Sequence, residues 1–278
     1  MGKVLLGVTS VLIPLYNHEE FIIQTLNSLL DSDCSQVELV ICDDASVDNS
    51  LELATTWIMK YKSMFMNTLI LSNIENRGIT ANLNKLVNEA SGEFMTLLAS
   101  DDMLPQGAID LQKKYLESQK EIDFIFVNCS IVDKDGKLIK QYAIAWYQSF
   151  LLRFKAYIMF TVLFNWGVVW SRLFVRRSAF IKFGNYIEEH ILEDRWSALK
   201  ILNTKRFVYL SAIGYLYRYR GIDAHPTVTS SVARRDFHNS ERVIHVEARG
   251  LLNILLWIRR VPFKTNHGKW PCRFLNLR

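Results

Sequence analysis

The sequence Val11-Leu12-Ile13-Pro14-Leu15-Tyr16-Asn17 begins with an apolar run and ends in polar residues. A helical pattern from His18 to Asp31 follows, and Val37 to Cys42 then forms a second apolar run. A buried strand, an amphipathic helix and a second buried strand in this order make one βαβ unit. This opening segment therefore predicts an α/β fold built on a mostly parallel sheet.

The same alternation continues as far as Val127. Ser46 is predicted to cap the next helix, which ends at Tyr61. Thr80 is predicted to cap the helix after that, with Gly92 at its left-handed carboxyl end. Further strands are expected at residues 68–71, 94–99 and 123–127.

The second half of the chain has a different pattern. A hairpin turn is expected at Lys134 to Lys137. The segment from Tyr142 to Ser171 holds ten aromatic residues and only two charges, which indicates either a lid over the core or an apolar docking surface. Strands are expected at 173–176, 207–209 and 213–219, and helices at 193–202 and 236–260.

Composition indicates a folded globular chain. Half of the 278 residues are apolar, the net charge is +5, and Ala156 to Trp170 is too short an apolar run to span a bilayer. Four cysteines without CxxC spacing favour a reduced, cytoplasmic protein. From Arg249 to Arg278 there are seven Lys and Arg residues and no acid, which suits an anionic membrane, a nucleic acid or a lipid-linked substrate.

Polar residues follow each of the first four predicted strands. In open α/β sheets ligands bind at this edge, so these side chains are expected to converge. The acidic pairs alone are also compatible with helix caps and turns. Neither GxGxxG nor GxxxxGK[ST] is present, so a bound phosphate would need a metal to neutralise it. The converging residues are Asn17, Glu19, Asp43, Asp44, Ser46, Asn76, Gly78, Asp101 and Asp102.

These motifs resemble the nucleotide-binding half of the family 2 glycosyltransferases, which have the GT-A fold. The matching stretches are residues 11–17, Asp43 to Ser50, Asn76-Arg77-Gly78 with Asn82, and Ser100-Asp101-Asp102. Glu193-Asp194-Arg195-Trp196, preceded by Phe183-Gly184-Asn185-Tyr186, resembles the acceptor-side motif of that family. The resemblance extends over about residues 9 to 220.

The resemblance implies a donor site. Asp43 would accept a hydrogen bond from a uracil or thymine ring, Asp44 and Ser46 would order the loop, and Arg77 and Asn82 would lie near the diphosphate or ribose. The nucleoside pocket would be lined by Pro14, Tyr16, Asn17 and Glu19.

The resemblance also implies a divalent metal, Mn²⁺ or Mg²⁺. Asp101 matches the last Asp of the family's DxD motif and would hold the metal and diphosphate, with Asp102 as a neighbouring metal candidate. Ala99 stands where the first Asp of that motif is usual, which puts the ribose contact usually made there in question but retains the metal-binding carboxylate. His225 resembles a lid histidine that approaches the metal or diphosphate, or else it is a solvent-facing loop residue. Arg218 and Arg220 are candidates for diphosphate contact.

On the acceptor side, Asp194 is predicted to be the base that takes the proton of the acceptor hydroxyl, with Glu193 as the alternative. Both could instead be first-turn acids that complement a helix dipole. Trp166 and Gly167 lie where an acceptor sugar would stack, although a core tryptophan is the competing interpretation.

The implied fold has three parts: a nucleotide-sugar-binding half at 1–130, a smaller acceptor-binding half at 131–235, and a C-terminal helical, basic tail at 236–278 that contacts the membrane surface. The implied activity is inverting transfer of a sugar, from a UDP-sugar by preference, to a polyprenyl-diphosphate-linked or saccharide acceptor in O-antigen or capsule synthesis. We place this activity in the cytoplasm, at the inner face of the membrane, without a nucleic-acid partner.

The residues are also compared with two other classes of protein, a sugar nucleotidyltransferase and a nucleic-acid-binding module. A sugar nucleotidyltransferase would need a Gly- and Lys/Arg-rich phosphate loop near the first strand, where this chain has Asn17-His18-Glu19-Glu20. A nucleic-acid-binding module would use the basic tail, but most other positive charges are interspersed with acids and no recognition motif is present.

Overall fold

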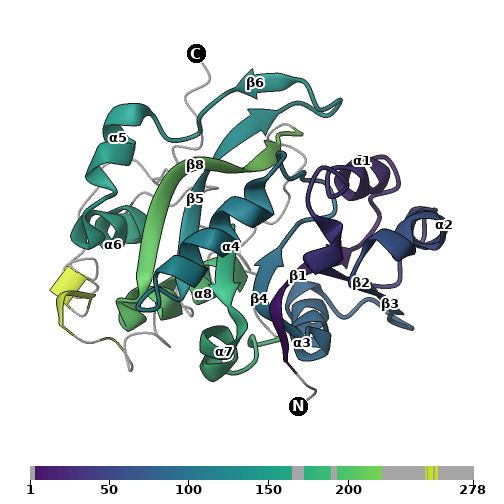
Figure 1. Cartoon of the computed structure of the whole chain (residues 1–278), viewed down its shortest axis with the longest axis horizontal. Helices are drawn as coiled ribbons and strands as arrows, with labels where there is room; N and C mark the ends of the chain where they lie inside the picture. Colours follow the sequence, from purple (N-terminus) through teal and green to yellow (C-terminus); the bar gives the residue numbers. More distant parts are fainter. Residues whose placement is uncertain are drawn as a thin grey trace, which may run out of the picture.

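The computed structural model describes residues 4–164, 172–188 and 193–220, with short pieces at 248, 250–252 and 254–255. Its strands form one eight-stranded sheet in the order β3-β2-β1-β4-β7-β5-β6, with β8 paired to β5 (Figure 1). The strands are β1 Leu5–Leu15, β2 Val37–Asp43, β3 Asn67–Ser72, β4 Gly92–Leu97, β5 Phe124–Val132, β6 Leu138–Lys140, β7 Leu173–Arg176 and β8 Phe207–Arg218.

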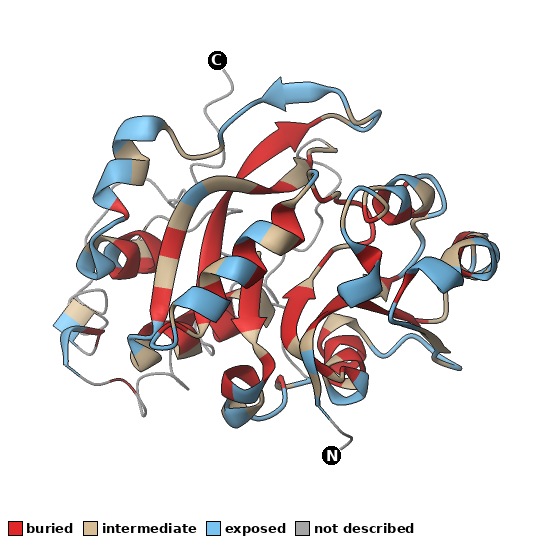
Figure 2. Ribbon diagram, in the orientation of Figure 1, coloured by how far each residue is buried: buried red, intermediate tan, exposed pale blue. Residues whose placement is uncertain are grey.

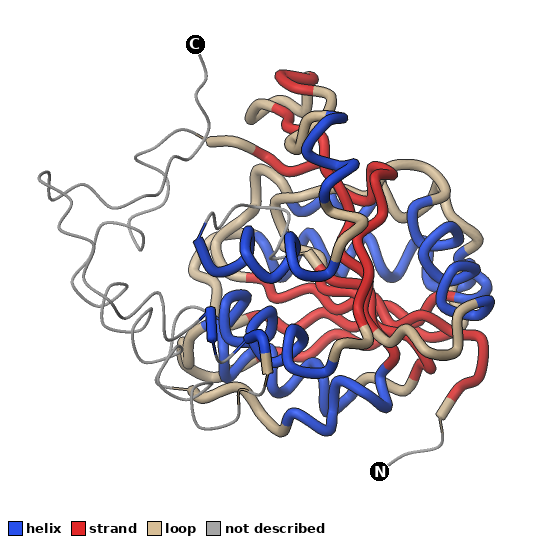
Figure 3. Tube along the Cα trace, turned by 90° about the vertical axis from the view of Figure 1, so that its left-hand side faces the viewer, coloured by secondary structure: helices blue, strands red, loops and turns tan. Residues whose placement is uncertain are grey.

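The helices lie on both faces of this sheet (Figure 3). Strands β2 and β5 are buried along their whole length, as expected where both faces are covered (Figure 2). The α-helices are α1 Ile22–Asn27, α2 Ser50–Tyr61, α3 Ile79–Glu89, α4 Ala108–Ser118, α5 Trp146–Leu151, α6 Lys155–Phe164, α7 Arg177–Phe180 and α8 Glu193–Thr204.

The strand order creates a switch point between β1 and β4. The chain runs from β1 to β2 and β3 on one side, then returns to add β4 parallel to β1 on the other side. Beyond β4 the pairing becomes antiparallel through β7 to β5, and β8 adds parallel to β5. A switch point in an open α/β sheet leaves a crevice at the carboxyl ends of its two strands. The predicted α/β fold with a mostly parallel sheet is confirmed.

The prediction that Gly92 ends a helix is wrong. Gly92 is the first residue of β4, and the helix α3 ends at the C-cap Ala90. A Cβ atom at residue 92 would lie 2.7 Å from Ser10 Oγ and 2.8 Å from the Val8 carbonyl oxygen. Glycine is therefore required here by the close approach of β1, and not by a left-handed conformation.

Two predicted helix caps are also wrong. Helix α2 begins at Ser50 after the N-cap Asn49, so Ser46 lies in the preceding loop. Helix α3 has Gly78 as its N-cap at φ 85°, and Thr80 lies inside the first turn. Both hydroxyls bond to other segments of the chain: Ser46 Oγ accepts from the Asn17 amide at 3.0 Å and Thr80 Oγ1 donates to the Glu188 carbonyl at 3.0 Å.

Other predicted helices and strands are present in the structure, but their first and last residues differ from the prediction. The first helix is only residues 22–27 of the expected 18–31, and the two strands expected at 207–209 and 213–219 are one strand with register shifts against β5. The hairpin turn is confirmed between β5 and β6, with Gly136 at φ 84°. Helix α4 was not anticipated. Most of the predicted 236–260 helix lies outside the described residues.

No helix in the described part of the chain is long and apolar enough to cross a membrane.

Candidate active site

The loops after β1 and β2 hold each other by reciprocal hydrogen bonds. Asn17 Oδ1 accepts from the Val47 amide at 2.9 Å, while the Asn17 amide donates to Ser46 Oγ. Glu19 Oε2 accepts from both the amide and the side chain of Asn49 at 2.9 Å. These contacts satisfy the polar side chains of Asn17 and Glu19 within the protein, so both residues shape the site's rim.

Asp44 connects the loop after β3 to the same rim. Its Oδ1 accepts from Asn73 Nδ2 at 2.7 Å and from the Arg77 amide at 3.0 Å, and its Oδ2 accepts from the Gly78 amide at 2.8 Å. A carboxylate that accepts three such bonds fixes the path of the backbone. The side chain of Arg77 points elsewhere, to an exposed ion pair with Glu188 at 3.3 Å.

Asp43 is buried and has one carboxylate oxygen without a partner. Its Oδ2 accepts from the Ser46 amide at 3.1 Å, but its Oδ1 has no hydrogen-bond partner among the residues that the structure describes. Asn82 shows the same feature, because its Nδ2 donates to the Cys42 carbonyl at 2.8 Å while its Oδ1 is unpaired. Buried acceptors are costly to leave unsatisfied, so an unpaired one indicates a ligand or water position.

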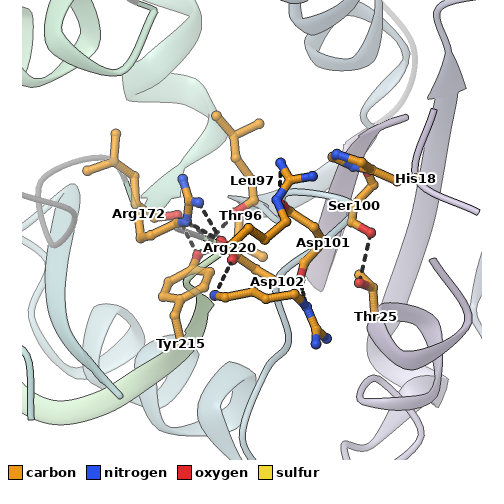
Figure 4. Close-up of polar contacts among 12 residues, drawn as sticks. His18, Thr25, Thr96, Leu97, Ser100, Asp101, Asp102, Arg172, Tyr215 and Arg220 are labelled. Carbon is orange, nitrogen blue, oxygen red and sulfur yellow. Dashed lines mark hydrogen bonds and ion pairs between the residues drawn. The ribbon is translucent and has the colours of Figure 1, made fainter. Parts of the chain in front are cut away.

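Asp101 and Asp102, after β4, have different surroundings (Figure 4). Asp101 Oδ2 pairs with Arg220 Nη2 at 3.0 Å. Asp102 is fully buried and accepts from Arg172 Nε at 2.8 Å and from the Arg218 amide at 3.0 Å. Asp102 is thus occupied by protein partners on both oxygens, whereas Asp101 has a single, partly exposed ion pair.

The two arginines at the end of β8 also differ. Arg218 is completely buried and donates to protein acceptors: the Asp101 carbonyl at 2.7 Å, Gln24 Oε1 at 2.8 Å and the carbonyls of the hairpin turn. Arg220 keeps 24% of its side chain exposed. Arg218 therefore joins three segments of the chain, and Arg220 is the arginine of this pair that remains open to a ligand.

His18 belongs to the site although no motif pointed to it. Its Nδ1 lies 2.7 Å from Ser100 Oγ, immediately before the acidic pair, and its amide donates to Ser50 Oγ at 2.8 Å (Figure 4). Burial lowers the pKa of His18, against the opposing effect of Asp101. The imidazole is therefore neutral near pH 7.

A cavity of about 70 Å³ opens between the switch point and the start of α8. Its lining includes Pro14 from β1, Ala99 after β4, and Glu193 and Asp194 at the start of α8. Because Ala99 has only a methyl group, the segment after β4 adds no carboxylate to this lining. The remaining lining residues are Ile79, Leu83, Leu97, Arg172, Tyr186 and Ser197.

Helix α3 positions the segment that leads to these two acids. Asn84 Oδ1 accepts from the Tyr186 amide at 2.7 Å, and Asn84 Nδ2 donates to the Tyr186 carbonyl at 3.0 Å. Paired amide bonds of this kind hold a loop as a strand would. The sequence offered no signal for this contact, since it joins positions 102 residues apart.

Glu193 and Asp194 both have raised pKa values. Burial, reinforced by Asp194, raises the pKa of Glu193 to about 8. Burial also raises the pKa of Asp194, but the Arg195 amide donates to Asp194 Oδ1 at 2.6 Å and opposes this shift. A hydrogen bond to the charged form favours ionisation, so the Arg195 amide stabilises the carboxylate form of Asp194.

The remaining predicted residues fall into two groups. Tyr16 is exposed at the rim. Trp166, Gly167 and His225 lie outside the described residues.

The residues fit a divalent cation only in part. No group of three His, Cys, Asp or Glu side chains converges anywhere in the described ranges. Asp101 supplies one hard oxygen donor, and Arg220 is its ion-pair partner among the described residues. Mg²⁺ commonly binds through one or two carboxylates, with substrate phosphates and waters completing its shell. The donor chemistry therefore fits a cation that is bound together with a diphosphate.

An open α/β sheet with acidic side chains at its switch point and two further acids in the lining of a cavity beside it is the GT-A architecture. TarS from S. aureus, in complex with UDP-GlcNAc, superimposes with a TM-score of 0.67 over 86% of this chain and 66% of its own, at 23% identity. The mannosyltransferase PcManGT from Pyrobaculum calidifontis, in complex with GDP-Man and Mn²⁺, superimposes with a TM-score of 0.64 over 90% of this chain and 68% of its own, at 16% identity. Both likenesses concern the fold.

Residues 10–184 match the model of Glycosyl transferase family 2, and the chain belongs to this family. Among curated relatives, chondroitin synthase from Pasteurella multocida is 32% identical over 132 residues, which is 48% of this chain and 13% of that protein. Glycosyltransferase GlyG from Streptococcus pneumoniae is 26% identical over 120 residues, which is 43% of this chain and 38% of that protein. The chain spans half the length or less of the curated relatives it matches.

Proposed function

We propose that the chain is an inverting glycosyltransferase that moves a sugar from a UDP-sugar to a hydroxyl group of a saccharide or polyprenyl-diphosphate-linked acceptor during synthesis of a bacterial surface polysaccharide. The observation that carries this proposal is the cavity that Glu193 and Asp194 line together with residues at the ends of β1 and β4. A donor at the switch point and a base across from it are the two components that glycosyl transfer needs.

The nucleoside half of the proposed donor site rests on Asp43. Its unpaired, buried Oδ1 suits the N–H group of a uracil ring, which would supply the missing donor. Asn17, Glu19, Asp44 and Ser46 then act through the loops they hold, and Pro14 and Tyr16 border the pocket. Asn82 Oδ1 is a second acceptor near this end of β2.

The diphosphate half rests on Asp101 and Arg220. Asp101 would hold Mn²⁺ or Mg²⁺, and when bound the cation supplies positive charge to the departing diphosphate. Arg220 would exchange its pairing with Asp101 for a phosphate oxygen. Asp102, a metal candidate from the sequence, is proposed instead to position the turn through Arg172. Arg77 and His225 remain proposals for phosphate contact.

Asp194 is proposed as the base because it lines the cavity and because its carboxylate accepts a hydrogen bond from the Arg195 amide, which favours the charged form. Its carboxylate would take the proton of the acceptor hydroxyl, and the hydroxyl oxygen would attack the anomeric carbon opposite the leaving group. Attack from that side inverts the anomeric configuration. Trp166 and Gly167 are proposed to bind the acceptor.

The proposal is tested by measuring nucleoside diphosphate release from a panel of UDP-, GDP- and dTDP-sugars with Mn²⁺ or Mg²⁺, and again with EDTA. We expect release from a UDP-sugar that EDTA suppresses, and a product of inverted configuration by NMR. Release of pyrophosphate from UTP and a sugar phosphate would instead support a nucleotidyltransferase. Failure of every sugar nucleotide to bind or react would overturn the proposal.

A further inference from the structure

The aromatic segment between residues 142 and 160 is divided into a buried and an exposed set of side chains. Aliphatic residues of α6, including Ile158 and Val162, pack into the core at 1% and 0% exposure. Six aromatic residues are exposed, with Trp146 at 83% and Phe154 at 59%, whereas Tyr157 is partly buried against the core (Figure 2 shows α5 and β6 largely in the exposed colour). The exposed aromatic set is Tyr142, Trp146, Tyr147, Phe150, Phe154 and Phe160.

The exposed aromatic residues are concentrated in this one segment of the chain. Six of the seven exposed aromatic residues of the described chain lie in this segment, and Tyr16 is the seventh. Leu138 and Ile139 of the neighbouring strand β6 are also exposed, at 61% and 43%. Exposed apolar groups that gather in this way mark an interaction site, whereas single ones do not.

The charges of the segment have one sign. From residue 137 to residue 164 the sequence contains Lys137, Lys140, Arg153 and Lys155 and no Asp or Glu. The guanidinium of Arg153 lies 5.1 Å from the ring centroid of Phe150. Trp and Tyr with flanking Lys and Arg are the composition of a surface that lies in the interface of an anionic bilayer. Lysine, by contrast, is depleted in protein–protein interfaces.

We propose that β6, α5 and the start of α6 form a membrane-docking surface that binds anionic phospholipid bilayers. This surface is distinct from the basic C-terminal tail that the sequence pointed to. Binding itself does not depend on the proposed transferase activity, so the two can fail separately.

Both ends of this surface are attached to the candidate active site. Arg218, which donates to the Asp101 carbonyl, also donates to the Lys134 carbonyl in the turn before β6. Arg195, next to Asp194, donates from Nη1 to the Val162 carbonyl of α6 at 3.3 Å. Docking would therefore hold the site close to the bilayer, where a lipid-linked acceptor of the proposed reaction would be found.

The test is co-sedimentation of the full chain with vesicles of phosphatidylcholine alone and of phosphatidylcholine mixed with phosphatidylglycerol. We expect binding to the anionic vesicles, and at least about a tenfold loss in the triple variant Trp146→Ala/Phe150→Ala/Phe154→Ala. The matched control, Met59→Ala/Met64→Ala/Met66→Ala, removes exposed apolar groups elsewhere and should bind as the unaltered chain does.

Variants that remove positive charge test the electrostatic part of vesicle binding without removing apolar side chains. Lys140→Gln/Arg153→Gln should lose about tenfold on anionic vesicles and little on neutral ones, while Lys60→Gln/Lys62→Gln should lose nothing. Thermal unfolding of each variant reports whether the fold is retained. The proposal is overturned if the unaltered chain does not bind anionic vesicles, or if Arg259→Gln/Arg260→Gln is the only variant that abolishes binding. It is equally overturned if the aromatic variants alter self-association and leave vesicle binding unchanged.

Discussion

Arg172 and Asp102 form a buried ion pair beneath the candidate active site, with side chains 17% and 1% exposed. Arg172 Nε donates to Asp102 Oδ2 at 2.8 Å, and its Nη2 reaches the same oxygen. Arg172 also lines the cavity that holds Glu193 and Asp194. One side chain thus joins the turn after β4 to the acidic start of α8.

Replacing Arg172 by Gln should destabilise the fold. The change leaves the Asp102 carboxylate buried without a counter-ion, which typically costs about 3–5 kcal/mol. Urea unfolding measures this cost, and Arg77→Gln is the control because the Arg77–Glu188 pair is exposed and worth at most about 1 kcal/mol. Equal losses of unfolding free energy in Arg172→Gln and Arg77→Gln would contradict a stabilising role of the buried Arg172–Asp102 ion pair. The Arg172→Gln/Asp102→Asn double variant should lose less than the sum of the single variants.

Asp43 should control which nucleobase the donor site binds. Asp43→Ala removes an acceptor for the uracil N–H and should weaken UDP binding about 10- to 100-fold by calorimetry. The side-chain amide in Asp43→Asn can donate a hydrogen bond as well as accept one. This variant should therefore have a smaller ratio of UDP affinity to CDP affinity, because the ring nitrogen of cytosine accepts a hydrogen bond. Asp31→Asn, at an exposed position, is the control. An unchanged UDP to CDP ratio in Asp43→Asn would remove Asp43 from the nucleoside pocket.

The two acids after β4 should respond differently to removal of their charge. Asp101→Asn should raise the Mn²⁺ concentration needed for UDP binding, with little effect on the unfolding temperature. Asp102→Asn should lower the unfolding temperature because it breaks the pair with Arg172. Calorimetry with and without EDTA, beside thermal unfolding, separates the two effects. A shared phenotype would mean that both carboxylates have the same role.

The acid limb of the pH profile should report Asp194 and not Glu193. The base acts without its proton, so kcat/KM should fall as pH drops through the raised pKa of Asp194. The pKa of Glu193 is raised as well, to about 8, so substitution is needed to tell the two acids apart. Glu193→Gln should leave an acid limb in the profile of kcat/KM, whereas Asp194→Asn should remove it. Loss of the acid limb in Glu193→Gln would assign the base to Glu193.

Much of the sheet and the rim of the site could be predicted because their signals are local. Apolar runs such as Val37 to Cys42 identify buried strands, and polar residues at strand ends such as Asp43 and Asp101 meet wherever the strands are parallel. The acidic start of α8 was also predicted, since the Glu193-Asp194 pair opens a helical pattern.

What sequence reasoning missed depends on contacts between distant segments. Gly92 looked like a helix end, but the nearness of Ser10 determines it. His18 carries no motif and enters the site only because Ser100 lies beside it. Arg218 was predicted to contact the diphosphate, but its guanidinium donates hydrogen bonds to backbone carbonyls of other segments. No periodicity in one chain encodes such partners.

The most direct test of the account is the single-turnover rate of sugar transfer by Asp194→Asn, with UDP-sugar affinity measured on the same protein. We predict unchanged donor affinity and a rate lower by about 10²–10⁴-fold, with Glu193→Gln losing much less. Transfer by Asp194→Asn at the rate of the unaltered chain would contradict the assignment of this cavity as the place where the acceptor is activated.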